Sequence, residues 1–378
     1  MRRGEADTPF PSVAVAGPVT RVRLADGEHA WLATRYDDVR TVLGDPTFSA
    51  AGDPMHRATP GADAPFIGRL PHTDPPEHSR YRRPLGRAFT PRRVAAWRPA
   101  IARAVDDHLD AMAAAGPPVD LIESLAVPVP LSVVGALMDL PRHDWPSLRD
   151  AATTLLSDAP DREKAGATNA WLLEYLHALV AKRRAEPGSD LLSELIEHSD
   201  LGDMEVADLG ATLVLGGFDS LAASIGTGVA LILCHPDRPR ALAGENERLD
   251  PLVEETLRFT TIVQRGVDRT AVTDCRLGDA EIRAGDRVVA DLPAANRDRD
   301  RWPEADTYDP TRPARTNVAF GHGPHLCVGV HLARLELRIV LDRVLTRFPG
   351  LKLAVPADRL VLCRDRTFAG LRELPVTW

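Results

Sequence analysis

One segment near the end of the sequence combines a cysteine with the residues of a tight loop: Phe320-Gly-His-Gly-Pro-His-Leu-Cys327-Val-Gly329. Two glycines and a proline precede Cys327, and the pattern after it predicts a helix. At a helix start, the helix dipole and free backbone N–H groups favour a thiolate. A thiolate held in this way can bind haem iron and favour O–O cleavage. The alternative is a glycine-rich loop with an ordinary buried cysteine.

A second candidate for chemistry is Leu215-Gly-Gly-Phe-Asp-Ser220, inside an apolar segment that runs from about Asp208 to Leu233. Two glycines in a helix interior cost about 1 kcal/mol each relative to alanine, and a buried carboxylate needs a partner. Together they predict a local opening of the helix, in which the Ser220 hydroxyl bonds back to the carbonyl of Gly216. The alternative is a helix kink with a solvated acid.

The cysteine loop fits Phe-Gly-x-Gly-x-His-x-Cys-x-Gly followed by Leu332-Ala-Arg334, and it resembles the haem-ligand loop of the cytochrome P-450 superfamily. The chain resembles a soluble bacterial member over nearly its whole length. Residues 216–220 are similar to that superfamily's Ala/Gly-Gly-x-Asp/Glu-Thr segment, with Ser220 in place of threonine and Leu221 in place of a frequent second threonine. The resemblance implies a mainly α fold with a smaller β-rich portion, in which haem lies between a long central helix and the cysteine-ligand helix.

The resemblance also assigns site residues. It implies that Cys327 binds the iron, and that basic side chains meet the two haem propionates, which need cations or donors when they are buried. His78 and Arg82 are spaced to share one helix face, although each basic residue alone is more simply an exposed one. The residues expected around the haem are His78, Arg82, Gly216, Gly217, Arg269, Ala319, Phe320, Gly321, His325, Cys327, Gly329 and Ala333.

Glu255-Thr-Leu-Arg258 matches the superfamily's Glu-x-x-Arg, whose pair supports the haem loop. The two side chains share a helix face, and the alternative is a solvated surface ion pair of small value. Relatives often complete this pair with an arginine from a later loop. Thr307 stands at that place here, which leaves open whether Arg312 substitutes.

The resemblance implies that Asp219 and Ser220, with water, relay the protons needed for O–O cleavage. It places the substrate pocket along the loop from Ala51 to Leu70 and at four further positions, for which ordinary core packing is the alternative. These positions are Phe218, Ile262, Val263 and Phe368, and Ile262 stands where many relatives have proline.

The implied function is a haem-thiolate monooxygenase that uses haem b and O2 to hydroxylate or epoxidise a small apolar or amphipathic metabolite in bacterial natural-product biosynthesis. The same oxidant could serve oxidative coupling, ring closure or desaturation, and a non-catalytic haem-thiolate sensor or docking protein is an alternative of another class. The substrate could be free or attached to a carrier protein. Electrons would come from NAD(P)H through a ferredoxin reductase and a ferredoxin. The arginines expected to steer that ferredoxin are Arg83, Arg87, Arg92 and Arg93.

The elements that must position these residues are mostly helical. A helix is predicted from about Gly329 to Arg347, ended by Phe348-Pro-Gly350. Residues 20–24 and 30–34 flank an Asp-Gly turn and predict a β-hairpin, and residues 280–283 and 287–292 show a similar pattern. No low-complexity linker divides the sequence, so one domain over residues 1–378 is expected.

Composition excludes several other classes. The chain has 378 residues and a formal net charge of −8, so it has no basic surplus and nucleic acid is not expected as a partner. No run of about 18 apolar residues predicts a membrane span, and no apolar segment follows the N-terminal Met1-Arg-Arg, so a cytoplasmic protein is expected. The four cysteines match neither a zinc site nor a disulfide framework.

Overall fold

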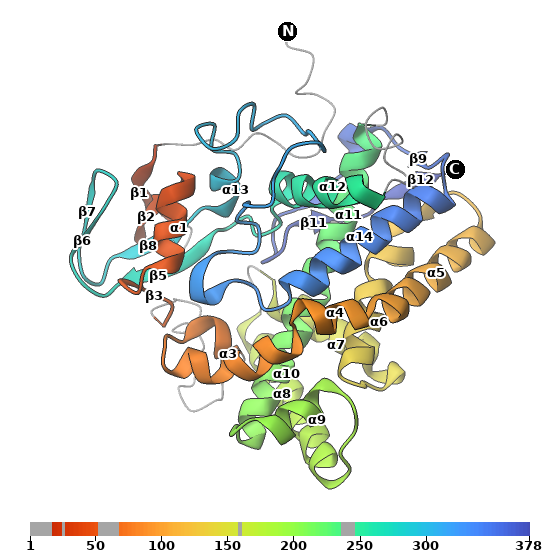
Figure 1. Cartoon of the computed structure of the whole chain (residues 1–378), viewed down its shortest axis with the longest axis horizontal. Helices are drawn as coiled ribbons and strands as arrows, with labels where there is room; N and C mark the ends of the chain where they lie inside the picture. The colour runs from red at the N-terminus through yellow and green to blue at the C-terminus, as the bar shows by residue number, and fades with distance from the viewer. Residues whose placement is uncertain (1–16, 25–26, 52–67, 158–160, 236–245) are drawn as a thin grey trace.

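The computed structural model describes residues 17–24, 27–51, 68–157, 161–235 and 246–378. Helices fill most of the molecule, and a five-stranded sheet with α1 lies at one side of it (Figure 1). The predicted fold class, mainly α with a smaller β-rich portion, is confirmed. The helices are α1 (Tyr36–Gly44), α3 (Glu77–Ala88), α4 (Pro91–Ala96), α5 (Arg98–Ala115), α6 (Pro128–Leu137), α7 (Trp145–Leu155), α8 (Arg162–Ala185), α9 (Leu191–His198), α10 (Asp203–Gly217), α11 (Asp219–Cys234), α12 (Asn246–Thr260), α13 (Leu292–Ala295) and α14 (Val330–Arg347).

Twelve short strands form four sheets within the described residues, and the largest has the order β1-β2-β8-β5-β3. In it β2 and β8 are parallel, whereas the other neighbours are antiparallel. The remaining sheets are β4-β12-β9, β6-β7 and β10-β11. The strands are β1 (Val19–Arg23), β2 (His29–Ala33), β3 (Phe48–Ser49), β4 (Val119–Asp120), β5 (Val267–Ala271), β6 (Cys275–Leu277), β7 (Ala280–Ile282), β8 (Arg287–Ala290), β9 (Lys352–Leu353), β10 (Leu362–Cys363), β11 (Gly370–Leu371) and β12 (Pro375–Thr377).

One predicted hairpin is confirmed and the other is wrong. β1 and β2 pair antiparallel, with Val19 opposite Ala33. The strands β7 and β8 exist, but β7 pairs with β6 and β8 pairs with β5 and β2. The turn between them explains the difference, because its backbone bonds to β5: Gly285 donates to the Ala271 carbonyl and Ala271 donates to that of Asp286, at 2.8 and 2.9 Å. The chain therefore crosses from one sheet to the other at this turn.

The long central helix that the sequence predicts is present but divided. Its two parts, α10 and α11, meet at Phe218, which has a φ of −102°. The Ser220 hydroxyl donates to the Gly216 carbonyl at 2.6 Å, which confirms the expected bond at the opening. Gly217 is needed for packing, because a Cβ there would lie 2.9 Å from Cγ2 of Val134 in α6. The opening therefore depends on one glycine for close approach and on one serine for the local hydrogen bond.

Taken together, residues Asp203–Cys234 are long and apolar enough to pass a length-and-composition test for a membrane span. The sequence pattern predicts no such run. However, 67% of the tested window is buried inside the protein, and a helix that is apolar all round also arises as the core helix of a soluble fold. α11 contacts α12 and α14 directly, so it is packed on protein rather than exposed for lipid.

Two hydrophobic clusters hold these elements. The larger one joins the helices and includes most of α11. The smaller one lies under the five-stranded sheet, where Tyr36 of α1 packs edge-on against Trp302 at 6.2 Å between ring centroids. The segment that carries Cys327 runs between α1 and α14, so it is supported from both clusters.

Candidate active site

The loop that carries Cys327 lies against α1 through a close backbone approach. Gly323 has a φ of +72°, and a Cβ there would lie 2.7 Å from the Leu43 carbonyl oxygen and from Cα of Gly44. Glycine is needed at this position, because a side chain would force the backbone of α1 to move. The Cys327 N–H donates to the Phe320 carbonyl at 3.0 Å and closes the loop just before α14.

The surroundings of the Cys327 thiol affect its pKa in opposite directions. Its side chain retains solvent-accessible surface, yet burial raises the pKa of the thiol. The backbone N–H of Gly329 and the charges of Arg82 and Arg334 lower that pKa to a smaller extent. A bound metal cation would reverse the balance, since a coordinating thiol is deprotonated outright. The protein surroundings alone thus favour the neutral thiol, whereas the Gly329 N–H and the two arginines would support a thiolate once a cation is bound.

Four basic side chains from separate segments gather near Cys327: His78 and Arg82 from α3, Arg269 from β5 and His325 from the loop. The rings of His78 and His325 lie 4.1 Å apart between centroids. The pKa of His325 falls to about 3, mainly because of burial and then because of the Arg269 charge. Burial, and then Arg82, lowers the pKa of His78. Basic side chains in this setting suit a ligand that carries carboxylates. The negative charge of a bound carboxylate would favour the protonated, cationic forms of the two histidines.

The other residues expected around the haem lie at the helix opening, in the cysteine loop or against the helical cluster. A Cβ on Gly216 would meet no atom within 4 Å, so the opening between α10 and α11 leaves free space. Gly321 has a φ of +77° in the cysteine loop. Ala319, Phe320 and Ala333 are half-buried and pack against the helical cluster.

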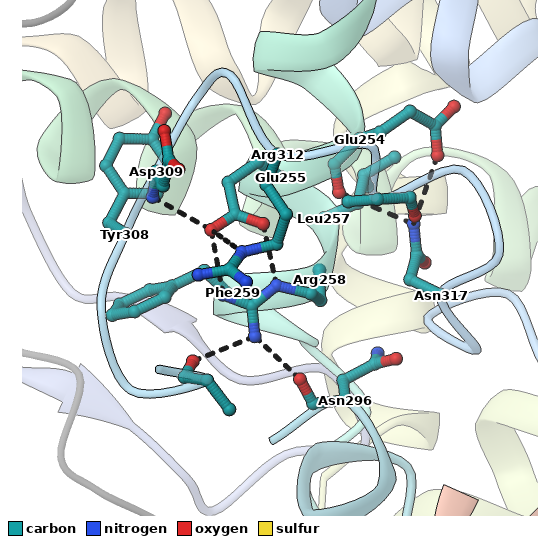
Figure 2. Close-up of polar contacts among 12 residues, drawn as sticks. Glu254, Glu255, Leu257, Arg258, Phe259, Asn296, Tyr308, Asp309, Arg312 and Asn317 are labelled. Atoms are coloured by element: carbon teal, nitrogen blue, oxygen red, sulfur yellow. Dashed lines mark hydrogen bonds and ion pairs between the residues drawn. The ribbon is translucent and has the colours of Figure 1, made fainter. Parts of the chain in front are cut away.

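Glu255 and Arg258 of α12 form a fully buried ion pair, both side chains having 0% exposed surface (Figure 2). Arg258 donates to the two carboxylate oxygens of Glu255 at 2.6 and 2.8 Å. The same guanidinium donates to the backbone carbonyls of Asn296, Ala305 and Thr307, at 2.7, 2.9 and 3.4 Å. The pair therefore fixes the long connection that precedes the cysteine loop. The alternative of a solvated surface pair is wrong.

Arg312 occupies the place left open by Thr307. Its Nε lies 3.3 Å from Oε1 of Glu255, so one carboxylate receives two guanidinium groups. Thr307 contributes only its backbone carbonyl, which accepts from Arg258 and from Arg312 at 3.4 Å each. Arg312 thus supplies the second guanidinium of this buried group (Figure 2).

Sequence reasoning missed a second charged group beside this pair. Glu254, also of α12, accepts from Arg334 of α14 at 2.6 and 3.0 Å and from the Asn317 side chain at 3.0 Å. The two adjacent glutamates, Glu254 and Glu255, could have predicted it. In a buried helix each carboxylate needs its own partner, so two glutamates predict two basic partners.

Asp219 begins α11, immediately after the opening. Its side chain is 15% exposed, and burial raises the pKa of the carboxyl. Arg366 and Arg149 oppose that shift, and Nη1 of Arg366 lies 4.0 Å from Oδ1 of Asp219. Neither arginine was singled out from the sequence, because they lie in α7 and in the C-terminal segment. The acid is thus enclosed and near two cations, and it adjoins Ser220.

The four pocket positions differ in their surroundings. Phe218 is 2% exposed and belongs to the larger hydrophobic cluster. At this position ordinary core packing, the alternative to a pocket residue, describes the side chain. Ile262, Val263 and Phe368 are half-buried. The segments around Ile262 and Phe368 are adjacent, because the N–H of Ala369 donates to the Ile262 carbonyl at 2.8 Å.

Most of the expected pocket loop, residues 52–67 of Ala51–Leu70, lies outside the described residues. Its C-terminal end is held by Asp208 of α10, a residue that the sequence pattern does not single out. The carboxylate of Asp208 accepts from the backbone N–H groups of Gly68 and Arg69, at 2.8 and 3.2 Å. Burial raises the pKa of this carboxyl to about 6.

All four arginines expected to steer a ferredoxin are exposed. They lie in α3 and α4, and α4 contacts α14. Arg93 forms a two-pronged ion pair with Glu194 of α9. Within the described residues no such ion pair involves Arg83, Arg87 or Arg92. These three charges are therefore the ones available to a partner.

Comparison with known proteins gives a consistent result. The family model described as cytochrome P450 matches residues 132–352. Nocardicin C N-oxygenase of Nocardia uniformis subsp. tsuyamanensis is 43% identical over 368 residues, which cover 96% of this chain and 92% of that one. Mycinamicin IV hydroxylase/epoxidase of Micromonospora griseorubida is 38% identical, with coverages of 96% and 92%. The crystal structure of the LnmA cytochrome P450 hydroxylase from the leinamycin pathway of Streptomyces atroolivaceus has a TM-score of 0.87 at 37% identity, with coverages of 96% and 94%.

Proposed function

This chain belongs to the cytochrome P450 family and is a monooxygenase, and we propose that it binds haem b through the thiolate of Cys327 to oxidise a small organic metabolite. The observation that carries the proposal is the convergence of four basic side chains near Cys327. They are His78, Arg82, Arg269 and His325. A thiolate suits iron, and two arginines beside two histidines suit the negative charge of two propionates. The whole chain, residues 1–378, acts as one domain.

The residues around Cys327 have the chemistry that a bound haem would need. Cys327 would provide the sulfur ligand, and the Gly329 N–H, which bonds to that sulfur, would tune its basicity. When bound, haem iron supplies the activation of dioxygen that no side chain can perform. The protein positions the ligand loop, supplies cations for the propionates and excludes bulk water from the acid Asp219.

Asp219 and Ser220 deliver protons at the opening between α10 and α11. Asp219 takes up and releases the proton, because its carboxyl is largely buried and burial raises its pKa above the usual value. Ser220 bonds to the Gly216 carbonyl at 2.6 Å, and rotation of its hydroxyl would present the proton to the open side of Gly216. Arg366 stabilises the negative charge of the Asp219 carboxylate after the proton has left.

The substrate is a small apolar or amphipathic intermediate of natural-product biosynthesis, free or attached to a carrier protein. Relatives named for nocardicin C and mycinamicin IV support this class. Hydroxylation or epoxidation is the proposed reaction. The half-buried Ile262, Val263 and Phe368 line the pocket, whereas Phe218 supports it from the core. The enzyme works in the cytoplasm with electrons from NAD(P)H.

A ferredoxin, reduced by its reductase, docks near α3 and α4. Replacing Arg83, Arg87 and Arg92 together with glutamine should slow ferredoxin-dependent reduction about tenfold at low salt and remove most of its salt dependence, because electrostatic steering is lost. Stopped-flow reduction with a surrogate [2Fe–2S] ferredoxin measures this. Arg93→Gln is the matched control, since the charge of Arg93 is already paired with Glu194. An unchanged rate in the triple variant would exclude this surface.

The haem proposal is tested by the difference spectrum between reduced, CO-bound protein and reduced protein, recorded beside Cys327→Ala. Wild type should give a strongly red-shifted Soret band, because a thiolate donates electron density through the iron. The variant should lose that band completely. A well-folded, haem-supplemented wild type without haem absorbance would overturn the proposal.

A further inference from the structure

Two ion pairs cross between α12 and α14, one turn apart on each helix. Asp250 pairs with Nε of Arg338 at 2.8 Å, and Glu254 pairs with Nε of Arg334 at 2.6 Å. Their settings differ. Asp250 has a 51% exposed side chain and also faces Arg315 at 3.8 Å, whereas the Glu254 side chain is 8% exposed. Glu254 is therefore the buried acid of the two, and its partner Arg334 is the arginine nearer Cys327 along α14.

The Glu254 pair connects to the ligand loop by two routes. The guanidinium carbon of Arg334 lies 5.0 Å from the ring centroid of Phe320, a cation–π distance. By the other route, Glu254 accepts from Nδ2 of Asn317 at 3.0 Å, and Oδ1 of Asn317 accepts from the N–H of Ala319 at 3.1 Å. Figure 2 shows the Glu254–Asn317 contact beside the Glu255–Arg258 pair.

Both routes end at the residues that hold the cysteine. Phe320 follows Ala319 directly, and its carbonyl accepts the Cys327 N–H at 3.0 Å. The positive charge of Arg334 lies in the helix that follows Cys327 and over the ring of Phe320. One charged group thus reaches the ligand loop through two sets of contacts.

We propose that Glu254, Arg334 and Asn317 are positioning residues that hold the loop for iron ligation and set the reduction potential of the bound haem. The inference rests on the proposed haem-thiolate function. Arg334 supplies the positive charge, Glu254 balances it, and Asn317 fixes the backbone ahead of Phe320. None of the three needs to touch substrate or iron.

Opposite charge changes should shift the midpoint potential in opposite directions. Reduction adds an electron to the haem, so a nearby positive charge favours the reduced form. Glu254→Gln leaves Arg334 without its buried counter-ion and should shift the potential to more positive values. Arg334→Gln removes the cation and should shift it to more negative values. A purely structural role would not give shifts of opposite sign.

Asp250→Asn is the matched control, because it removes a carboxylate from the other pair between the same two helices. Its potential should equal that of wild type. Arg334→Lys keeps the charge but loses the two-pronged bond to Glu254, so its potential should stay near wild type while its ligand loop loosens. Asn317→Ala removes the hydrogen-bonded route alone and should behave in the same way.

The experiment combines spectroelectrochemical titration with CO difference spectra recorded along a urea series. Loosened variants should convert to the shorter-wavelength CO band of haem without thiolate at lower urea than Asp250→Asn, and before their far-UV circular dichroism changes. If Glu254→Gln does not fold, Arg334→Lys and Asn317→Ala decide the positioning role and Arg334→Gln decides the charge role. Potentials and conversion points equal to the control would overturn the inference, whereas a wild type without the red-shifted band would overturn the haem proposal itself.

Discussion

Replacing Arg258 with methionine is expected to lower the free energy of unfolding by about 3–5 kcal/mol, the usual cost of breaking a buried ion pair from one side. The substitution leaves Glu255 fully buried with the longer contact to Arg312 and one backbone bond, from the N–H of Asp309 at 2.9 Å. It also removes the donor for three backbone carbonyls in the segment before the ligand loop. Because domains are stable by only about 5–15 kcal/mol, little of the variant should retain haem at 37 °C.

Urea unfolding followed by far-UV circular dichroism measures the loss, with haem absorbance recorded on the same samples. The stability of Arg258→Lys should lie between those of wild type and Arg258→Met. Lysine keeps the positive charge but lacks the planar guanidinium that reaches five acceptors. Arg338→Met is a control on another helix, at an ion pair whose acid is half-exposed; it should cost less than about 1 kcal/mol. If Arg258→Met were as stable as this control, the Glu255 pair would not be what holds the connection.

Short-range spacing explains what the sequence could predict. The loop from Phe320 to Gly329, the helix after it and the Glu255–Arg258 spacing are set by residues a few positions apart, and each element is present. The Ser220 bond to Gly216 is of the same kind. In these cases the local chain determines the geometry, so a pattern of glycine, proline and charge is enough.

The parts that could not be predicted depend on partners that are distant in sequence. Asp208 meets Gly68, Arg334 meets Glu254, and Arg366 meets Asp219, each over a separation that no local pattern encodes. The wrong hairpin has the same origin. The turn at Gly285 looks local, but its N–H bonds to Ala271 of β5, and that ladder decides the pairing.

Asp219→Asn and Ser220→Ala are each expected to reduce product formation by about 10²–10⁴-fold, the usual contribution of a positioned proton donor. Neither side chain belongs to the cysteine loop or to the basic group near it, so both variants should keep the red-shifted CO band. Measured with surrogate ferredoxin and reductase, NAD(P)H consumption should continue in Ser220→Ala with little product. Asp219→Asn should slow consumption as well, because it removes the group that holds the proton.

Loss of fold is not the expected cause. Burial raises the pKa of Asp219, so the folded state binds a proton more tightly than the unfolded chain does, and ionisation at neutral pH opposes folding. An asparagine side chain carries no such charge, so the Asp219→Asn variant should be at least as stable as wild type. In Ser220→Ala the lost bond to Gly216 is one that bends the helix, and alanine favours helix. Thermal unfolding of both variants should therefore stay close to wild type.

Ser224→Ala provides the matched control. The Ser224 hydroxyl makes the same kind of bond, to the Ser220 carbonyl at 3.0 Å, one turn further along α11. That hydroxyl lies beyond the opening, so its removal should leave turnover and coupling unchanged. A loss in Ser224→Ala equal to that in Ser220→Ala would mean that α11 responds to any change in its hydrogen bonding. Unchanged product formation in both Asp219→Asn and Ser220→Ala would instead remove these residues from proton delivery, and the protons would have to reach the site by water alone.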